Sequence, residues 1–250
     1  MIWLDNFFFG GRMKHSMRHL CLVVLVISTV ACGGGGSGGG SQAGPSTTEP
    51  TYDIQALGIP RFVGRQHIPL ASIAQISRFR SSVGHSYTDP SEPCRSMKHY
   101  FAQRGSTPQT LIVSSPVDGT VRQLTPESNG DALQLHIQAT NQPAFRIILF
   151  HATPSVSLAV GTPVSAGQPI ATTTAFLSDV AVSVNTPQGS RYVSWFDVMA
   201  EALFQEYRAV GVGARDDMII SRAARDADPL TCNGESFLTT GTLPNWVLLQ

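Results

Sequence analysis

The sequence has little charge and no excess of either sign. Charged residues make up only 14% of its 250 residues, and 17 basic side chains balance 17 acidic ones. Proteins that bind nucleic acid carry a basic surface, so the balance excludes nucleic acid as a partner. The basic residues are almost all arginine, since Lys14 and Lys98 are the only lysines. The hydrophobic content of 42% is ordinary for a globular protein and leaves room for a real core.

A long hydrophobic run is also missing. The apolar stretch 20–30 has eleven residues, whereas a membrane-spanning helix needs about 20. A basic segment at 14–18 precedes it, and a short apolar run behind basic residues is typical of a secretory signal. We therefore expect residues 1–31 to be a signal peptide. Residues 1–12 fit no such signal, which points to Met13 as the true start.

The cysteine that follows resembles the end of a bacterial lipobox. Thr-Val-Ala-Cys ends at Cys32, and in a lipobox the cysteine is lipidated and becomes the first residue, which anchors the protein to the membrane. Residues 32–51 are rich in glycine and serine and predict a disordered tether. Gly33, and not aspartate, follows the cysteine, which predicts the outer membrane, facing the periplasm. The alternative is that Cys32 is an ordinary buried cysteine.

Cysteine is scarce, with four in the chain. Cys21 leaves with the signal and Cys32 carries the lipid, so Cys94 and Cys232 remain. In an oxidising compartment, such a pair predicts a disulfide. The alternative, a pair of zinc thiolates, has no CxxC spacing to support it.

The rest of the chain, 52–250, predicts one mainly β domain with an antiparallel sheet and a C-terminal helical extension. Hydrophobic and polar residues alternate with a period of two in several segments, which is typical of half-buried strands. Two helices are expected near the end. Apolar residues at helical spacing predict the first at 194–211, and a second, shorter helix is expected at 216–227, ending before Pro229. The expected strands are 111–115, 132–138, 145–151 and 179–184, and the expected core face of the first helix is Phe196, Met199, Leu203 and Tyr207.

Four motifs occur in an order that resembles a known family. They are His85-x-x-x-Asp89, Ser-Pro-Val-Asp-Gly-Thr-Val at 115–121, Phe-His ending at His151, and Val-Gly-Thr-Pro-Val-Ser-Ala-Gly-Gln-Pro-Ile at 160–170. Over 84–185 the chain is similar to the lysostaphin-type zinc endopeptidases, which cut peptidoglycan cross-bridges. The resemblance implies a β fold of the duplicated hybrid motif type.

The resemblance also assigns roles to residues. His85 and Asp89 match the first two zinc ligands, and His151 matches a histidine that assists catalysis near the attacked carbonyl. Asp179 and Ala181 stand where the family has the two histidines of its closing motif, the second of which is the third zinc ligand. Because alanine has no donor atom and a catalytic zinc normally keeps three protein ligands, we expect zinc to be weakly bound or absent and catalysis to be lost. The alternative is that Asp179 serves as a variant ligand.

The segment 89–101 does not belong to the family pattern. It places Cys94, Arg95 and Lys98 directly after the proposed ligand pair. One interpretation is a loop over the groove whose basic side chains attract carboxylates. The other is an insertion anchored by the disulfide, whose polar side chains only cap strands. The sequence leaves both open.

Two further histidines have no assigned role. His136 is expected on the polar face of its strand, and His67 has no partner in view. The leading hypothesis is a non-catalytic envelope lipoprotein that binds peptidoglycan or a protein partner. An active zinc peptidase with Asp179 as ligand and a purely structural lipoprotein are the alternatives.

Overall fold

The computed structural model describes residues 49–127, 132–155 and 157–250. The predicted signal peptide at 1–31, the proposed lipidated Cys32 and nearly all of the tether lie outside the described residues. Within the described part, no helix has the length and hydrophobicity needed to cross a membrane.

The described chain consists mainly of short β-strands. Its strands are β1 (Ile73–Ser77), β2 (His99–Gln103), β3 (Leu111–Ser114), β4 (Gly119–Pro126), β5 (Leu133–Ala139), β6 (Phe145–Pro154), β7 (Pro163–Val164), β8 (Pro169–Thr173), β9 (Leu177–Thr186), β10 (Gly189–Val193), β11 (Cys232–Asn233), β12 (Ser236–Phe237) and β13 (Trp246–Leu248). Its helices are α1 (Ile54–Leu57), α2 (Trp195–Val198), α3 (Glu201–Arg208) and α4 (Arg222–Ala227), with 3-10 turns η1 (Leu70–Ser72) and η2 (Arg215–Met218).

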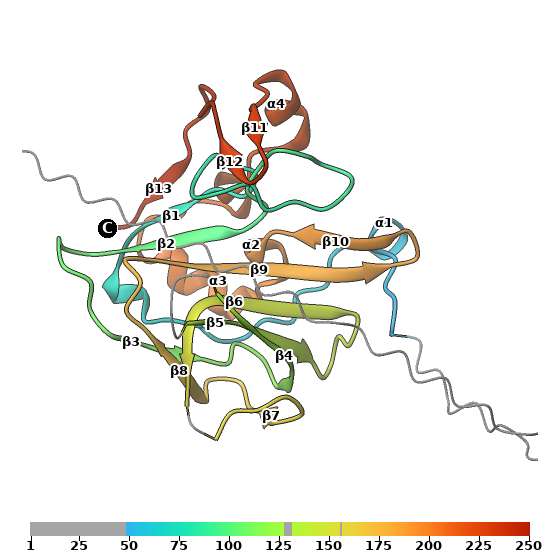
Figure 1. Ribbon diagram of the computed structural model, residues 1–250, viewed down its shortest axis with the longest axis vertical. Helices are drawn as coiled ribbons and strands as arrows, with labels where there is room; N and C mark the ends of the chain where they lie inside the picture. Colours follow the sequence, from blue (N-terminus) through green and yellow to red (C-terminus); the bar gives the residue numbers. More distant parts are fainter. Residues whose placement is uncertain (1–48, 128–131, 156) are drawn as a thin grey trace, which may run out of the picture. The chain divides into compact units, whose positions relative to one another are not determined.

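The strands pair antiparallel throughout, in the order β13-β1-β2-β9-β6-β5-β4-β7. Strand β10 continues from β9 as a hairpin, and β8 pairs with both β3 and β6. Figure 1 shows β9 and β6 side by side in the middle of the sheet, with β2 beyond β9. The prediction of a mainly antiparallel β domain is confirmed.

The two faces of β9 have different surroundings, as its alternation predicts. Val180, Val182 and Val184 point into the main hydrophobic core. Ala181 lies on the opposite face, where it packs with Ile148 and Phe150 in a small separate cluster. Because side chains two apart share a face of a strand, Asp179 belongs to the same face as Ala181. This face is where the candidate site lies.

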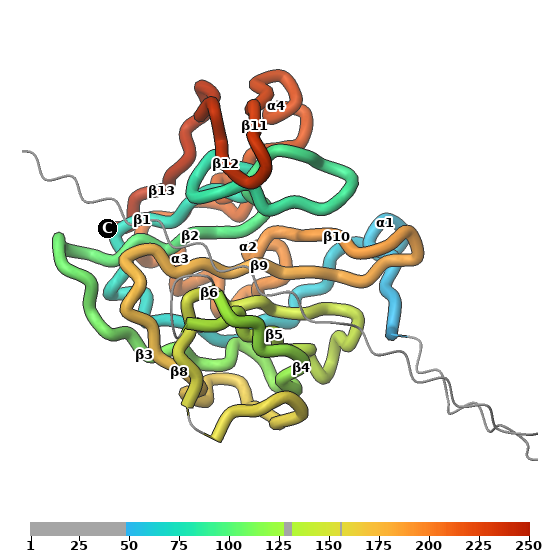
Figure 2. The backbone as a smooth tube through the Cα atoms, viewed as in Figure 1, coloured from blue at the N-terminus to red at the C-terminus, as the bar shows by residue number. Residues whose placement is uncertain are grey.

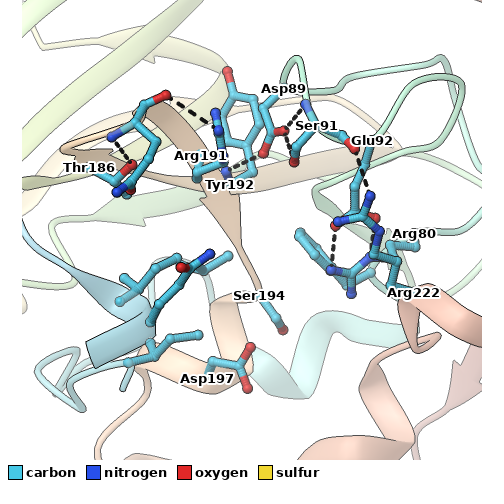
Figure 3. A pocket seen from close by; sticks show the side chains of 16 residues that line it. Arg80, Asp89, Ser91, Glu92, Thr186, Arg191, Tyr192, Ser194, Asp197 and Arg222 are labelled. Atoms are coloured by element: carbon cyan, nitrogen blue, oxygen red, sulfur yellow. Dashed lines mark hydrogen bonds and ion pairs between the residues drawn. The ribbon is translucent and has the colours of Figure 1, made fainter. Parts of the chain in front are cut away.

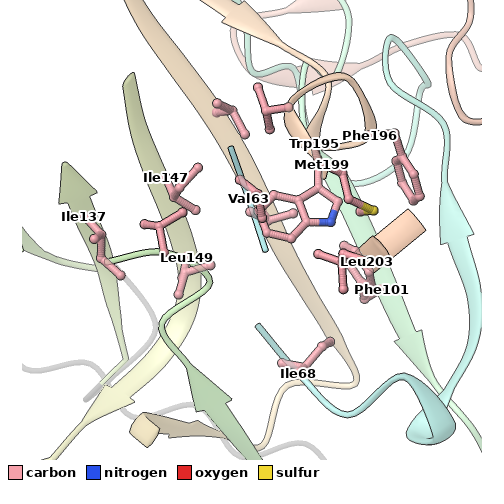
Figure 4. Packing of buried hydrophobic residues seen from close by; sticks show 14 of the residues in the cluster. Val63, Ile68, Phe101, Ile137, Ile147, Leu149, Trp195, Phe196, Met199 and Leu203 are labelled. Carbon is pink, nitrogen blue, oxygen red and sulfur yellow. The ribbon is translucent and has the colours of Figure 1, made fainter. Parts of the chain in front are cut away.

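The main core joins the sheet to the C-terminal helices. In Figure 4, Trp195, Phe196, Met199 and Leu203 gather on one side of the cluster. Ile147 and Leu149 of β6 lie on the other. All four residues of the predicted helix face are buried, namely Phe196, Met199, Leu203 and Tyr207.

Each predicted helical region is interrupted by extended backbone. The first region divides into α2 and α3 because residue 199 forms a parallel bridge with Val63, whose backbone oxygen accepts a hydrogen bond from Ala200 N at 2.8 Å. The second divides into η2 and α4 because the backbone at 218–220 pairs with Phe79. Contacts with distant parts of the chain therefore override the local helical period.

The predicted disulfide is present and ties two surface segments together. Cys94 and Cys232 are bonded, with their Cα atoms 5.7 Å apart. The bond holds the loop between β1 and β2 against the β11–β12 hairpin, and Ser86 N also donates to Glu235 O at 2.7 Å. Figure 2 shows this loop, in blue-green, running beside the red hairpin.

Two histidines are buried in the core and stay neutral. The Nδ1–H of His99 donates to Ser77 O at 2.7 Å, so its Nε2 accepts from the hydroxyl of Ser194 at 2.9 Å. His67 contacts Phe101 edge to face, and its ring has no hydrogen-bond partner within the described residues. Burial lowers the pKa of His99 to about 4 and that of His67 to about 3.

We predict that His67 makes the fold sensitive to acid. The folded chain keeps His67 neutral down to a pKa of about 3, whereas an unfolded histidine takes up a proton near pH 6.5. Stability is therefore complete above about pH 6.5 and falls as the pH drops toward 3. The free energy of unfolding of wild type should fall between about pH 7.5 and pH 5. In His67→Leu this fall should be smaller than in wild type by about 2 kcal/mol. Urea titrations at the two pH values measure this difference.

Ile68→Val is the matched control, since Ile68 is a buried neighbour that does not titrate. It should lower stability by about 1 kcal/mol at both pH values. An unchanged acid sensitivity in His67→Leu would contradict the burial of a neutral imidazole.

Candidate functional site

A groove of about 590 Å³ opens on the face of the sheet opposite the main core. Its walls come from the loop before β2, from β2 and β6, and from the β11–β12 hairpin. The groove is lined by Gly84, His85, Tyr87, Lys98, Tyr100, Pro126, Glu127, Gln134, Phe150, His151, Leu177, Glu235 and Ser236. Two of the residues to which the sequence assigned chemistry, His85 and His151, therefore face one cavity.

A lysine lies at the floor of this groove. Lys98 immediately precedes β2 and is only 1% exposed. Its Nζ is 2.5 Å from Asp179 Oδ2 and 3.1 Å from His85 Nε2. Burying a charge is costly unless it is paired, and here the carboxylate of Asp179 supplies the pairing.

Three aromatic rings surround the same ammonium group. Lys98 Nζ is 4.0 Å from the ring centre of Phe150 and 4.9 Å from those of Tyr87 and Tyr100. Aromatic faces attract cations, and more strongly where water is excluded. Burial raises the pKa of both tyrosines, so their hydroxyls stay neutral and add no competing charge.

Asp179 links Lys98 to the second histidine of the groove. It lies on β9 opposite Tyr100 of β2, and its side chain is fully buried. Its Oδ1 is 3.1 Å from His151 Nε2. Both contacts are ion pairs by distance, but neither has the angles of a hydrogen bond. The negative charge of Asp179 is therefore balanced by the nearby Lys98 and His151, and not by hydrogen bonds.

His151 reaches Asp179 because β6 is irregular at this point. Opposite β5, Leu133 pairs with Ala152 and Leu135 with Leu149, so two residues of β6 face the single residue Gln134. This is a β-bulge, and it turns Phe150 and His151 toward the same groove. His151 has φ 53°, a left-handed conformation that costs energy for a residue with a side chain.

Two carboxylates lie against the ring of His151 and favour its protonated form. Asp179 lies at Nε2, and Glu127 Oε2 is 2.6 Å from Nδ1. Glu127 also accepts from the backbone N–H of His151 at 3.1 Å. The contact with Asp179, and after it the charge of Glu127, raises the pKa of His151 against the opposing effect of burial.

His85 presents a lone pair to the lysine. An ammonium group can only donate, so the Nε2 that lies 3.1 Å from Lys98 Nζ must be unprotonated. The proton is then on Nδ1, which lies 3.1 Å from Ser86 O and 3.3 Å from Glu235 Oε2. The disulfide-linked hairpin thus supplies the group that orients His85.

The structure places Asp89 in a different cavity. Its Oδ1 accepts from Ser91 N at 2.8 Å and from the Ser91 hydroxyl at 2.5 Å, and its Oδ2 accepts from Tyr192 N at 3.0 Å. Figure 3 shows these bonds at the wall of a pocket of about 330 Å³ that shares no lining residue with the groove. His85 and Asp89, four apart in sequence, are therefore not brought together.

The contacts of His85, Asp89 and Asp179 show whether these three expected ligands could hold a zinc ion. Both oxygens of Asp89 are engaged elsewhere, and the ammonium of Lys98 lies against His85 Nε2 and Asp179 Oδ2. Among the described residues, no three His, Cys, Asp or Glu side chains are grouped so as to hold a metal ion. The set of His85, Asp89 and Asp179 thus does not fit zinc as the side chains stand.

The segment 89–101 combines both interpretations that the sequence left open. Arg95 is buried and pairs with Glu92 at 2.8 Å and with Asp226 at 2.9 Å, so its role is structural. Lys98, in contrast, lies in the groove. Sequence reasoning missed Glu127 and Glu235 because isolated glutamates on loops give no local signal.

Comparison with known proteins gives only a partial likeness. No family model and no curated protein match the chain. The solution structure of lysostaphin is 17% identical over 46% of this chain and 52% of that one, with a TM-score of 0.30. The catalytic domain of the antimicrobial peptidase lysostaphin from Staphylococcus simulans, crystallised without phosphate, is 16% identical over 46% of this chain and 88% of that one, with a TM-score of 0.31. The match covers about half of the longer lysostaphin chain, and such TM-scores do not define a shared fold.

We predict that the pKa of His151 depends on its two carboxylates. Glu127→Gln and Asp179→Asn should each lower it, because each removes a negative charge that favours the imidazolium. Asp179→Asn should have the larger effect, since Asp179 contributes most to the shift. Histidine proton shifts followed by NMR against pH measure the change.

Glu235→Gln is the control, because Glu235 lies beside the other histidine, His85. It should leave the pKa of His151 unchanged. An equal shift in all three variants would mean that general surface charge, and not the contacts at His151, sets the pKa.

Proposed function

We propose that the chain is an envelope lipoprotein whose groove binds cell-wall peptide without cutting it. The support for membrane attachment is the sequence before and after Cys32, which has the features of a lipoprotein signal and tether. The expected location is the outer membrane, facing the periplasm. The support for a cell-wall ligand is the sequence resemblance over 84–185 to enzymes that act on peptidoglycan.

The position of Lys98 carries the non-hydrolytic part of the proposal. A zinc peptidase needs a metal with an open coordination position, where a bound water becomes acidic enough to attack. In this groove an ammonium group lies against His85 Nε2 and Asp179 Oδ2. A lysine ammonium has no open coordination position and cannot activate water in this way. The alternative of an active enzyme with Asp179 as ligand requires that Lys98 first leave.

The groove retains what a peptide-binding site needs. It combines aromatic walls from Tyr87, Tyr100 and Phe150 with polar groups at His151 and Glu235. Such a mixture of apolar surface and a few fixed polar groups is typical of ligand sites. The polar side chains are already held by neighbours, so little ordering is lost when a ligand binds.

The proposal predicts that the chain binds the cell wall and that a bulky residue in the groove weakens this binding. Ser236 lines the groove and is exposed, so Ser236→Trp should fill it and reduce binding to purified cell-wall sacculi by about tenfold or more, equivalent to about 1.4 kcal/mol. Co-sedimentation of the full chain with sacculi measures binding. Ser106→Trp, an exposed change on the loop between β2 and β3, is the matched control and should bind as wild type does.

Hydrolysis is assayed in the same samples with zinc added. The proposal expects no release of soluble peptides by the wild-type chain. Release that disappears in His85→Ala would show an active enzyme and contradict the proposal. Equal sedimentation of wild type and Ser236→Trp would contradict a ligand in the groove and favour a structural lipoprotein.

A further inference from the structure

The cavity that holds Asp89 is a second pocket, separate from the groove. Its volume of about 330 Å³ lies at the lower end of the range for small-molecule sites. Its walls come from α1, the loop after β1, the β9–β10 hairpin and the start of α2. Because the pocket shares no lining residue with the groove, a ligand here would bind independently of the cell wall.

One wall of the second pocket carries an arginine whose charge is left over. Arg191 of β10 donates to Ser190 O at 2.9 Å and to Gln188 O at 3.4 Å, both in its own hairpin. Both acceptors are backbone carbonyls, and Arg191 forms no ion pair with any residue that the structure describes. A guanidinium group has five N–H donors, so Arg191 can still bind an acidic group of a ligand.

The other two arginines that line the second pocket are already paired. Arg80 donates to both carboxylate oxygens of Glu92, at 2.6 and 2.8 Å. Arg222 lies 3.7 Å from Asp226. Arg191 is therefore the arginine of this pocket that is available to a ligand.

The opposite wall carries a carboxylate without a counterion of its own. Asp197 of α2 is half-buried, and no ion pair joins it to another residue in the described part of the chain. Burial raises the pKa of Asp197, and the charges of Arg80 and Arg215 oppose this effect only in part. Those two arginines are paired with Glu92 and Glu201. A cationic group of a ligand would stabilise the carboxylate of Asp197.

We propose that the second pocket binds a small zwitterion, either a free α-amino acid or a short peptide. The carboxylate of the ligand pairs with Arg191, and its ammonium group pairs with Asp197. Figure 3 shows Arg191 at the top of the pocket and Asp197 at the bottom. Ile54, Ile59 and Phe79 line the same space and provide a surface for an apolar side chain of the ligand.

A ligand with a single charge matches the second pocket less well. An anion would pair with Arg191 but would be repelled by the carboxylate of Asp197, and a cation would meet the reverse situation. A zwitterion balances both side chains at once. The separation of its two charged groups then decides which length of ligand fits.

Three probes of increasing length test the proposal, namely L-leucine, glycyl-leucine and glycylglycyl-leucine. Each is titrated into the full chain and followed by calorimetry. Tightest binding of leucine would identify a site for free amino acids, and tightest binding of a longer probe would identify a site for short peptides. The C-terminal amide of the best probe lacks the carboxylate, and its N-acetyl form lacks the ammonium group. Each derivative should bind at least about tenfold more weakly than its parent.

Two variants connect each charge of the ligand to one side chain. Arg191→Gln should weaken binding of the best probe by about tenfold and leave binding of its amide unchanged, because the amide has no carboxylate. Asp197→Asn should weaken binding of the same probe by a similar factor and leave binding of its N-acetyl form unchanged. Arg122→Gln changes an exposed arginine of β4 outside the pocket and is the matched control, which should bind as wild type does.

The proposal is overturned if none of the three probes binds at about 10 mM, or if either derivative binds as tightly as its parent. It is also overturned if Arg191→Gln or Asp197→Asn binds the best probe as wild type does. Both variants should still sediment with sacculi, since neither residue lines the groove. A failure here therefore leaves the proposal for the groove intact, and the reverse also holds.

Discussion

The buried ion pair between Lys98 and Asp179 is the constraint on which the groove depends. Neither side chain is more than 1% exposed, and their charged atoms are 2.5 Å apart. Each charge would be expensive to bury alone, and removing one partner of such a pair typically costs about 3–5 kcal/mol. The pair also joins β9 to the residue that immediately precedes β2. Three aromatic rings surround Lys98, and His151 lies beside Asp179 on the other side of the pair.

The same pair is the observation behind the proposal that the groove does not hydrolyse its ligand. A zinc peptidase depends on a metal ion with an open coordination position, where a water molecule is activated. Here the positive charge is the ammonium group of Lys98. This group already contacts Asp179 and His85. The surrounding groups still resemble a ligand site, since His85 and His151 are each oriented by an acidic side chain, Glu235 and Glu127 respectively. This arrangement supports the proposal that the groove binds a ligand without hydrolysing it.

Much of the fold was accessible from local pattern, but the site was not. The period-two alternation in β5 and β9 identified which side chains enter the core, and the cysteine count identified the disulfide. The break at Met199 was not visible because it arises from a bridge to Val63, far away in sequence. The bulge at His151 was not visible because it depends on how β6 pairs with β5. The family resemblance paired His85 with Asp89 as zinc ligands. The hydrogen bonds of Asp89 to Ser91 and Tyr192, which take it to another pocket, are tertiary contacts with no local signature.

A crystal structure of the wild-type protein grown with excess zinc, with diffraction recorded on both sides of the zinc absorption edge, tests the central claim most directly. The account predicts electron density for Lys98 Nζ between His85 and Asp179 and no anomalous peak in the groove. A zinc peak bound to His85 and Asp179, with the lysine side chain turned away, would contradict it.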